Sequence, residues 1–102
     1  MSRKAQILAM LADEPDNSFL RYGLAMEYVS AGQTELALAT FRELLQRDPD
    51  YVPAYLQAGQ LLARMGRESE ARDLLVQGIQ VAQRVGNSHA ASEMSSLLAT
   101  LA

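Results

Sequence analysis

The side chains that could support catalysis are few and scattered along the chain. The sequence contains one histidine, His89, and no cysteine, which excludes thiolate chemistry and a zinc site built from Cys and His. His89 is expected near the start of a helix, where the positive end of the helix dipole disfavours a charged imidazole. We therefore expect His89 to be an exposed polar residue, and we expect no metal and no cofactor.

Acidic clusters and serines are the remaining candidates for chemistry. The clusters at 13–16 and 68–70 stand at expected helix boundaries, where carboxylates stabilise helix starts and improve solubility. Ser92, Ser95 and Ser96 have no base at a defined spacing, and the six glycines form no phosphate-binding loop. The sequence therefore predicts a protein that is not an enzyme.

The most regular pattern is apolar and suits binding rather than catalysis. One stripe follows helical spacing, at i, i+3, i+7 and i+10: Phe19, Tyr22, Met26 and Val29. The equivalent positions thirty-four residues later are Pro53, Leu56, Gln60 and Ala63. The expected helix 17–31, which contains Phe19 to Val29, also carries a separate core stripe that includes Leu20 and Leu24. One of its two apolar faces is therefore left for a partner, or for another segment of the chain to cover. Tyr and Met are favoured at protein interfaces.

Length and composition narrow the class of protein. The chain has 102 residues, a formal net charge of −3 and 21% charged residues, which is typical of one soluble globular domain. The negative balance argues against nucleic-acid binding, which needs a positive surface. No apolar run approaches the ~18 residues of a membrane span, and no helix has the features of a membrane-surface anchor. We read the chain as mature from its first residue and as cytoplasmic.

An internal repeat sets the positions of the helices. Pro15 and Pro49 lie thirty-four residues apart, and the same offset pairs Gly32 with Gly66 and other residues of matching size. Between these prolines and glycines, the spacing of the apolar residues predicts helices and no strands. Their expected ranges are 2–12, 17–31, 34–47, 50–65, 67–85 and 87–101.

Helix 2–12 contains the apolar residues Ile7, Leu8 and Leu11, and two later helices have a predicted inner face. In helix 34–47 it contains Leu36, Ala37, Phe41, Leu44 and Leu45. In helix 67–85 it contains Ala71, Leu74, Leu75, Ile79 and Ala82. Small residues such as Ala25 and Gly59 are expected where helices approach closely.

These residues resemble the tetratricopeptide repeat (TPR) family, whose pattern has a period of about 34 residues. The matches in the first period are Leu24, Ala25, Tyr28, Ala37, Phe41 and Pro49, with Arg21 at the usual Trp position. The matches in the second are Tyr55, Gly59, Ala71 and Leu75. The resemblance implies an all-α fold, a right-handed superhelix of about six helices in antiparallel pairs. It divides a single domain, 1–102, into a half-repeat at 2–15, repeats at 18–51 and 52–85, and a capping helix at 87–102.

The resemblance also implies a scaffold for protein–protein contact, with a concave groove lined by the first helix of each repeat. The expected partner is another protein or a peptide, and the candidate contact residues are Phe19, Tyr22, Met26, Val29, Leu56, Gln60 and Ala63. Coverage of this stripe by a terminal helix and self-association through it remain open, as does a role as an accessory subunit. We expect a monomer or a weak homodimer.

Charged groups at the predicted groove are few. The family's clamp for a C-terminal carboxylate uses cations, but the positions that would carry it here are Tyr22, Met26, Gln57, Asn87 and Ala91. A buried carboxylate would have no charged partner there, so this ligand is rejected. Arg21 and Arg64 are expected to be solvated surface residues.

Overall fold

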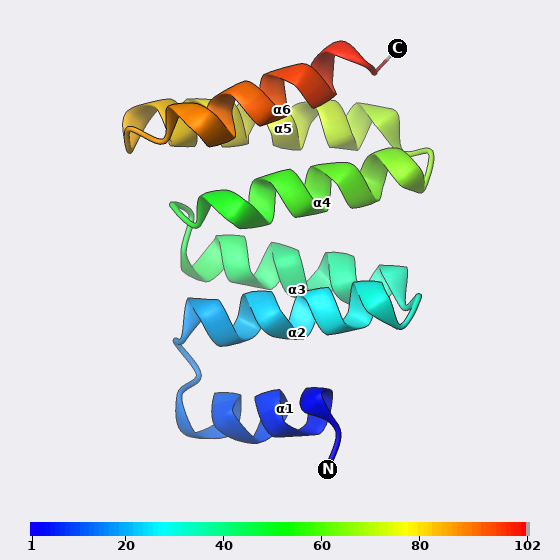
Figure 1. The fold of residues 1–102 in the computed structure, drawn as a ribbon, viewed down its shortest axis with the longest axis vertical. Coiled ribbons are helices and arrows are strands. Elements are labelled where there is room, and N and C mark those ends of the chain that lie inside the picture. The colour runs from blue at the N-terminus through cyan, green and yellow to red at the C-terminus, as the bar shows by residue number, and fades with distance from the viewer. Residues whose placement is uncertain (102) are drawn as a thin grey trace. The chain divides into compact units, whose positions relative to one another are not determined.

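Six helices and no strands make up residues 1–101, the part of the chain that this computed structural model describes (Figure 1). The helices are α1 Arg3–Asp13, α2 Ser18–Ser30, α3 Thr34–Arg47, α4 Val52–Arg64, α5 Glu68–Arg84 and α6 Ser88–Ala99. The last residue of the predicted helix 87–102, Ala102, lies outside the described residues.

The helix ends follow from local chemistry. Asn17 and Asn87 cap α2 and α6, because each side-chain oxygen accepts a hydrogen bond from a backbone N–H of the first turn. Gly32, Gly66 and Gly86 each lie two residues after the end of α2, α4 and α5 and have φ between 74° and 81°, a conformation that glycine adopts without steric cost. The α4 helix starts at Val52, two residues later than predicted, with Pro53 in its first turn.

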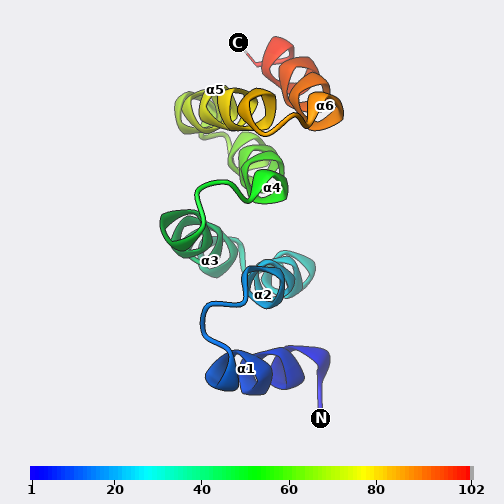
Figure 2. The same cartoon turned by 90° about the vertical axis from the view of Figure 1, so that its left-hand side faces the viewer.

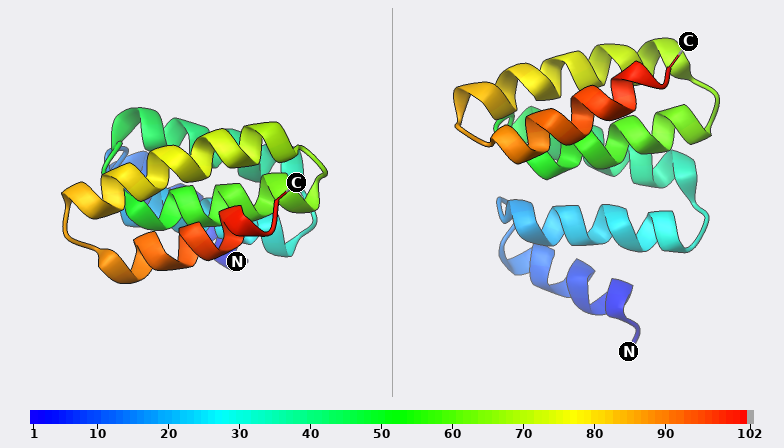
Figure 3. Two further views of the ribbon diagram at one scale, coloured as in Figure 1. Left: turned by 90° about the horizontal axis from the view of Figure 1, so that it is seen from above. Right: turned by 45° about the horizontal axis from the view of Figure 1, so that its top comes forward.

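The chain forms two compact units, and the first comprises Met1–Asp48. Within it α2 packs against both α1 and α3 (Figures 1 and 3). Ile7 and Leu11 of α1 form an apolar cluster with Leu24 of α2, and Leu20 and Tyr28 pack against this cluster. The predicted core stripe of α2 is therefore the face that meets α1.

The second unit begins at Pro49 and contains α4, α5 and α6. Each of these helices contacts the other two, and the view along them in Figure 2 shows a triangular arrangement. Two glycines permit close approach: a Cβ on Gly59 would lie 2.5 Å from Leu75 Cδ2, and one on Gly78 would lie 2.5 Å from Tyr55 Cβ. Met94 of α6 is fully buried beside Gly78.

One expected core residue, Leu36, is exposed instead. Leu36 is 49% exposed, whereas its neighbour Leu38 is fully buried. The buried residues of α3 surround Phe41, and Leu36 lies about 140° around the helix from it at 100° per residue. Leu8 is also exposed, since α1 contacts α2 through Ile7 and Leu11, which leaves Leu8 on the flank.

Candidate protein-binding surface

The α2 helix carries four of the predicted contact residues, and they differ in exposure. Phe19 is 73% exposed. Tyr22, Met26 and Val29 are half-buried. The Tyr22 ring packs at a tilt against the Phe41 ring of α3, with 6.2 Å between the ring centroids. Tyr22 therefore contributes to the contact between α2 and α3, while Phe19 is the most accessible member of the stripe.

Phe19 borders a hollow between α1 and α2, which we call the α1–α2 hollow. Its volume is about 380 Å³, and it is lined by Arg3, Gln6, Ile7, Met10, Phe19 and Gly23. Met10 is 47% exposed. Helical spacing places Phe19, Gly23 and Met26 along one side of α2, at i, i+4 and i+7, so the hollow adjoins the predicted stripe.

Gly23 shapes one wall of this hollow. A Cβ built on Gly23 would lie 3.5 Å from Ile7 Cδ1, an ordinary van der Waals distance. Glycine is therefore not required there for packing, in contrast to Gly78. Its presence leaves the wall without a side chain and widens the space beside Phe19.

The charged groups at the hollow come from the first turn of α1 and from α2. Arg3 Nε lies 2.7 Å from Glu27 Oε1, and the Arg3 side chain is 76% exposed. Lys4 Nζ lies 5.8 Å from the centroid of the Tyr28 ring, within cation–π range. Arg3, paired with Glu27, is thus the charged residue among those that line the hollow, whereas Lys4 lies against Tyr28 and outside that lining.

The α4 helix holds the other three predicted contact residues. Leu56, Gln60 and Ala63 are all half-buried. They belong to the second unit, whereas the four residues on α2 belong to the first. That both sets line one groove stays a prediction.

Comparison with known proteins identifies the family. A tetratricopeptide repeat model matches residues 28–101, and a second tetratricopeptide repeat model matches residues 2–53. The chain belongs to the tetratricopeptide repeat family. It is 33% identical to a TPR repeat-containing protein of Pseudomonas aeruginosa over 92 residues, which cover 90% of this chain and 88% of that protein.

Solved structures agree on the fold. A TPR domain protein of Salinibacter ruber matches 82% of this chain and 85% of its own, with a TM-score of 0.79 and 39% identity. A protein of Bordetella parapertussis matches 96% of this chain and 85% of its own, with a TM-score of 0.82 and 31% identity. The predicted class, an all-α TPR-like helical solenoid, is confirmed. Domains of this family are in general non-catalytic scaffolds for protein–protein interaction.

One TPR pattern position contradicts the prediction of a surface arginine. Arg21 is only 8% exposed, and its Nη1 donates to the Pro15 carbonyl oxygen at 2.6 Å. Thirty-four residues later the Tyr55 hydroxyl donates to the Pro49 carbonyl oxygen at 2.7 Å. Arg21 and Tyr55 are thus different residues that make the same contact in successive repeats. The 34-residue repeat places Arg21 and Tyr55 at equivalent positions. Because the two residue types differ, the sequence did not indicate that they make the same hydrogen bond.

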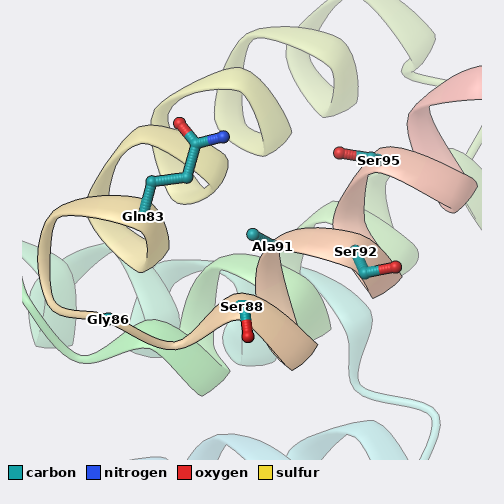
Figure 4. Close-up of a pocket in the computed structure, with 6 residues that line it drawn as sticks. All are labelled: Gln83, Gly86, Ser88, Ala91, Ser92 and Ser95. Carbon is teal, nitrogen blue, oxygen red and sulfur yellow. The ribbon is translucent and has the colours of Figure 1, made fainter.

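A second hollow lies within the other unit, and four of its six lining residues have polar side chains. It is lined by Gln83, Gly86, Ser88, Ala91, Ser92 and Ser95, with a volume of about 430 Å³ (Figure 4). His89 does not line it, and His89 Nε2 lies 2.9 Å from Glu93 Oε1 instead. Serine hydroxyls without a base in the lining do not form a nucleophilic site.

Two kinds of feature are absent from residues 1–101. No group of three or more His, Cys, Asp or Glu side chains in this part of the chain could hold a metal ion. None of the helices described here has the length and apolar character that crossing a bilayer requires.

Proposed function

We propose that this TPR protein is a non-catalytic interaction module that binds a peptide segment or a partner helix. The contact surface includes the α2 residues Phe19, Tyr22, Met26 and Val29. The α4 residues Leu56, Gln60 and Ala63 provide further contacts. The α1–α2 hollow receives an apolar side chain of the partner.

The exposure of Phe19 beside this hollow carries the proposal. Phe19 is 73% exposed, and full burial of such a ring stabilises a complex by about 1.5–3 kcal/mol. Aromatic residues next to a recess commonly act as anchors in protein interfaces. Phe19 has both properties, and it lies on the stripe that the repeat pattern predicts.

Affinity capture from the native cell extract, followed by mass spectrometry, tests the proposal. The wild-type chain is compared with Phe19→Ser and with Leu36→Ser, which removes an exposed apolar side chain from α3 of the same unit. We expect proteins captured by the wild type and by Leu36→Ser to be lost with Phe19→Ser. Equal capture by all three would contradict the proposal.

A variant at Tyr22 is unsuitable for this test, because the Tyr22 ring contacts the Phe41 ring. Its truncation would weaken the contact between α2 and α3 as well as the binding surface. Met26→Ala is the better second variant. We expect it to reduce capture while circular dichroism shows unchanged helix content.

The alternative function is a self-associating adaptor or an accessory subunit of a larger complex. It is favoured by the same exposed Phe19, which a second copy of the chain could also cover. Sedimentation at two well-separated concentrations distinguishes this alternative, since only self-association depends on the concentration of the chain alone.

A further inference from the structure

The α1 helix holds the same place in the repeat as α3 and α5. Four residues of α1 line the α1–α2 hollow, and the 34-residue offset pairs each with a residue of α3: Arg3 with Ala37, Gln6 with Thr40, Ile7 with Phe41, and Met10 with Leu44. A second step of the same length leads to four residues of α5: Ala71, Leu74, Leu75 and Gly78.

These equivalent positions differ in exposure from helix to helix. The four on α3 are all buried, with exposed fractions of 9% or less. On α5 three are buried and Leu74 is half-buried. On α1, by contrast, Arg3, Gln6 and Met10 are exposed and Ile7 is buried. The surface that is closed in α3 and α5 is therefore largely open in α1.

The helix that precedes α3 or α5 in the chain closes this surface. The α2 helix packs against α3 and contacts the Phe41 ring. The α4 helix packs against α5, where Gly59 lies beside Leu75. In the part of the chain that the structure describes, no helix precedes α1. The hollow thus continues the α2–α3 and α4–α5 interfaces to a position where the covering helix is not part of the described chain.

We propose that the α1–α2 hollow binds an amphipathic α-helix of another protein, which lies on α1 as α4 lies on α5. The α4 and α5 helices run antiparallel (Figure 1), so the bound helix runs antiparallel to α1. This inference rests on the proposed function, because it specifies the conformation and direction of the partner at the same surface.

The α4 helix indicates which residues the bound helix carries. A Cβ on Gly59 would lie 2.5 Å from Leu75 Cδ2, so α5 requires a very small residue at this crossing. Ile7 holds the position of Leu75 on α1, and we expect Gly or Ala opposite it. In α4 the buried Tyr55 and Leu62 stand four residues before and three residues after Gly59. The bound helix therefore has apolar residues at this spacing around a small one.

A second copy of this chain is a poorer occupant than another protein. Its α2 and α4 helices already pack against α3 and α5. Its α6 helix exposes polar side chains, among them Ser92, Glu93 and Ser95. A helix of another protein can present an apolar stripe that its own chain does not cover.

The test uses two phage-displayed peptide libraries against the full chain. One varies a single face of an Ala-, Glu- and Lys-rich helical peptide, and the other varies as many positions in a proline-containing peptide that does not form a helix. We expect binders from the helical library alone. A proline placed in the middle of the tightest binder should weaken binding roughly 10-fold or more. The circular dichroism of the complex should show more helix than the sum of the separate spectra.

Met10→Lys and Leu8→Lys are matched variants that locate the bound helix on α1. The two side chains are 47% and 44% exposed, and Met10 lines the hollow whereas Leu8 does not. The equivalents of Leu8 in α3 and α5, Arg42 and Val76, are exposed although a helix precedes each. Met10→Lys should weaken binding roughly 10-fold or more, because it buries a charge in the interface. Leu8→Lys should bind like wild type, and both variants should keep the wild-type helix content.

The outcomes separate this inference from the proposed function. Binders from the proline library, or helical binders that Met10→Lys does not weaken, would show that helix docking on α1 is wrong. The proposed surface would stand if Phe19→Ser weakens those binders. If Phe19→Ser leaves them unchanged, or if neither library yields a binder, both proposals are wrong.

Two further outcomes concern the anchor and the identity of the occupant. A helical binder that Met10→Lys weakens and Phe19→Ser does not would support the docked helix and contradict Phe19 as the anchor. A wild-type dimer that Met10→Lys dissociates in sedimentation velocity would make the occupant a second copy, and the assignment to another protein would be wrong.

Discussion

Gly23 and Gly78 lie inside helices in different surroundings, and they make a matched pair at the scale of single residues. Gly23→Ala introduces a Cβ at an ordinary 3.5 Å from Ile7 Cδ1. We expect this change to raise the free energy of unfolding by about 0.5–1 kcal/mol, because alanine favours the helix. Gly78→Ala places a Cβ 2.5 Å from Tyr55 Cβ and 2.6 Å from Met94 Sδ. We expect it to lower the free energy of unfolding by about 1–3 kcal/mol.

Urea denaturation of both variants measures these changes. The substitution is identical, so helix propensity contributes equally and the difference reports the space beside each glycine. Destabilisation of similar size by both substitutions would show that Gly23 is also tightly packed.

Arg21 illustrates the limit of reading single residues from a sequence. An arginine on a helix is usually a surface residue, since burying a charge is costly without a partner. In this protein the Pro15 carbonyl accepts from Nη1, and Glu43 Oε2 lies 3.9 Å from Nε. Pro15 is only six residues away, whereas Glu43 belongs to α3, and only the packing of α3 against α2 brings it to Arg21. The sequence shows that Arg21 and Tyr55 lie one repeat apart. It does not show that both side chains donate a hydrogen bond to a proline carbonyl.

At the scale of elements, α6 differs from α4 in which face is apolar. Residues that α4 buries against α5 include Tyr55, Gly59 and Leu62. The positions thirty-four residues later are His89, Glu93 and Ser96, and all three are exposed. A further repeat helix would find a polar face there. We therefore propose that α6 closes this end of the array, as predicted for residues 87–102.

Met94 anchors this closing helix to the second unit. Its side chain is fully buried and lies beside Gly78. We expect Met94→Ala to lower the free energy of unfolding by about 2–5 kcal/mol, since it removes buried atoms and leaves a cavity. Thermal melting followed by circular dichroism measures the loss.

Ser95→Ala, at the next and exposed position, is the control for Met94→Ala. It should change stability by less than about 0.5 kcal/mol. If Met94→Ala melts like the control, α6 does not stabilise the unit.

An ion pair joins the segment before α4 to the end of α5 and gives a pH-dependent prediction. Arg84 Nη2 donates to Asp50 Oδ1 at 2.5 Å, and Nη1 donates to Oδ2 at 3.3 Å. These hydrogen bonds hold the pKa of the Asp50 carboxyl below its ordinary value, which is about 3.9. The stabilisation is complete above that value and is lost as the pH falls through the lower pKa of the folded state.

Arg84→Gln should therefore be slightly less stable than wild type at neutral pH. The difference should disappear as the pH falls below about 3.9, and salt should reduce it because the pair is exposed. Urea denaturation across this pH range measures it. A difference that persists at low pH would assign the effect of Arg84 to packing rather than to charge.

The sequence predicts where the helices start and end. It predicts less well which residues on the sides of each helix are exposed. Helix starts and ends depend on local signals such as Asn17, Gly32 and Pro53, which act within a few residues. Leu36 was assigned to the core because it is apolar, and its position relative to Phe41 places it at the surface. The hollow beside Phe19 was not predictable, because it depends on how α1 crosses α2.

At the scale of the whole molecule, the exposed large apolar residues are distributed over several helices. Those on helices are Leu8 and Met10 on α1, Phe19 on α2, Leu36 on α3 and Val76 on α5. Isolated exposed apolar residues are normal on monomeric proteins. Phe19 and Met10 stand apart from the others because both line the α1–α2 hollow.

This dispersion predicts a monomer. A stable interface between copies buries about 1,200–2,000 Å² in total, which isolated side chains on separate helices do not supply. We expect sedimentation velocity to show the same monomeric species at two well-separated concentrations, for wild type and for Phe19→Ser alike. A wild-type dimer that Phe19→Ser dissociates would favour the self-associating adaptor. A dimer that persists in Phe19→Ser would place the contact between copies elsewhere and leave Phe19 free to bind a partner.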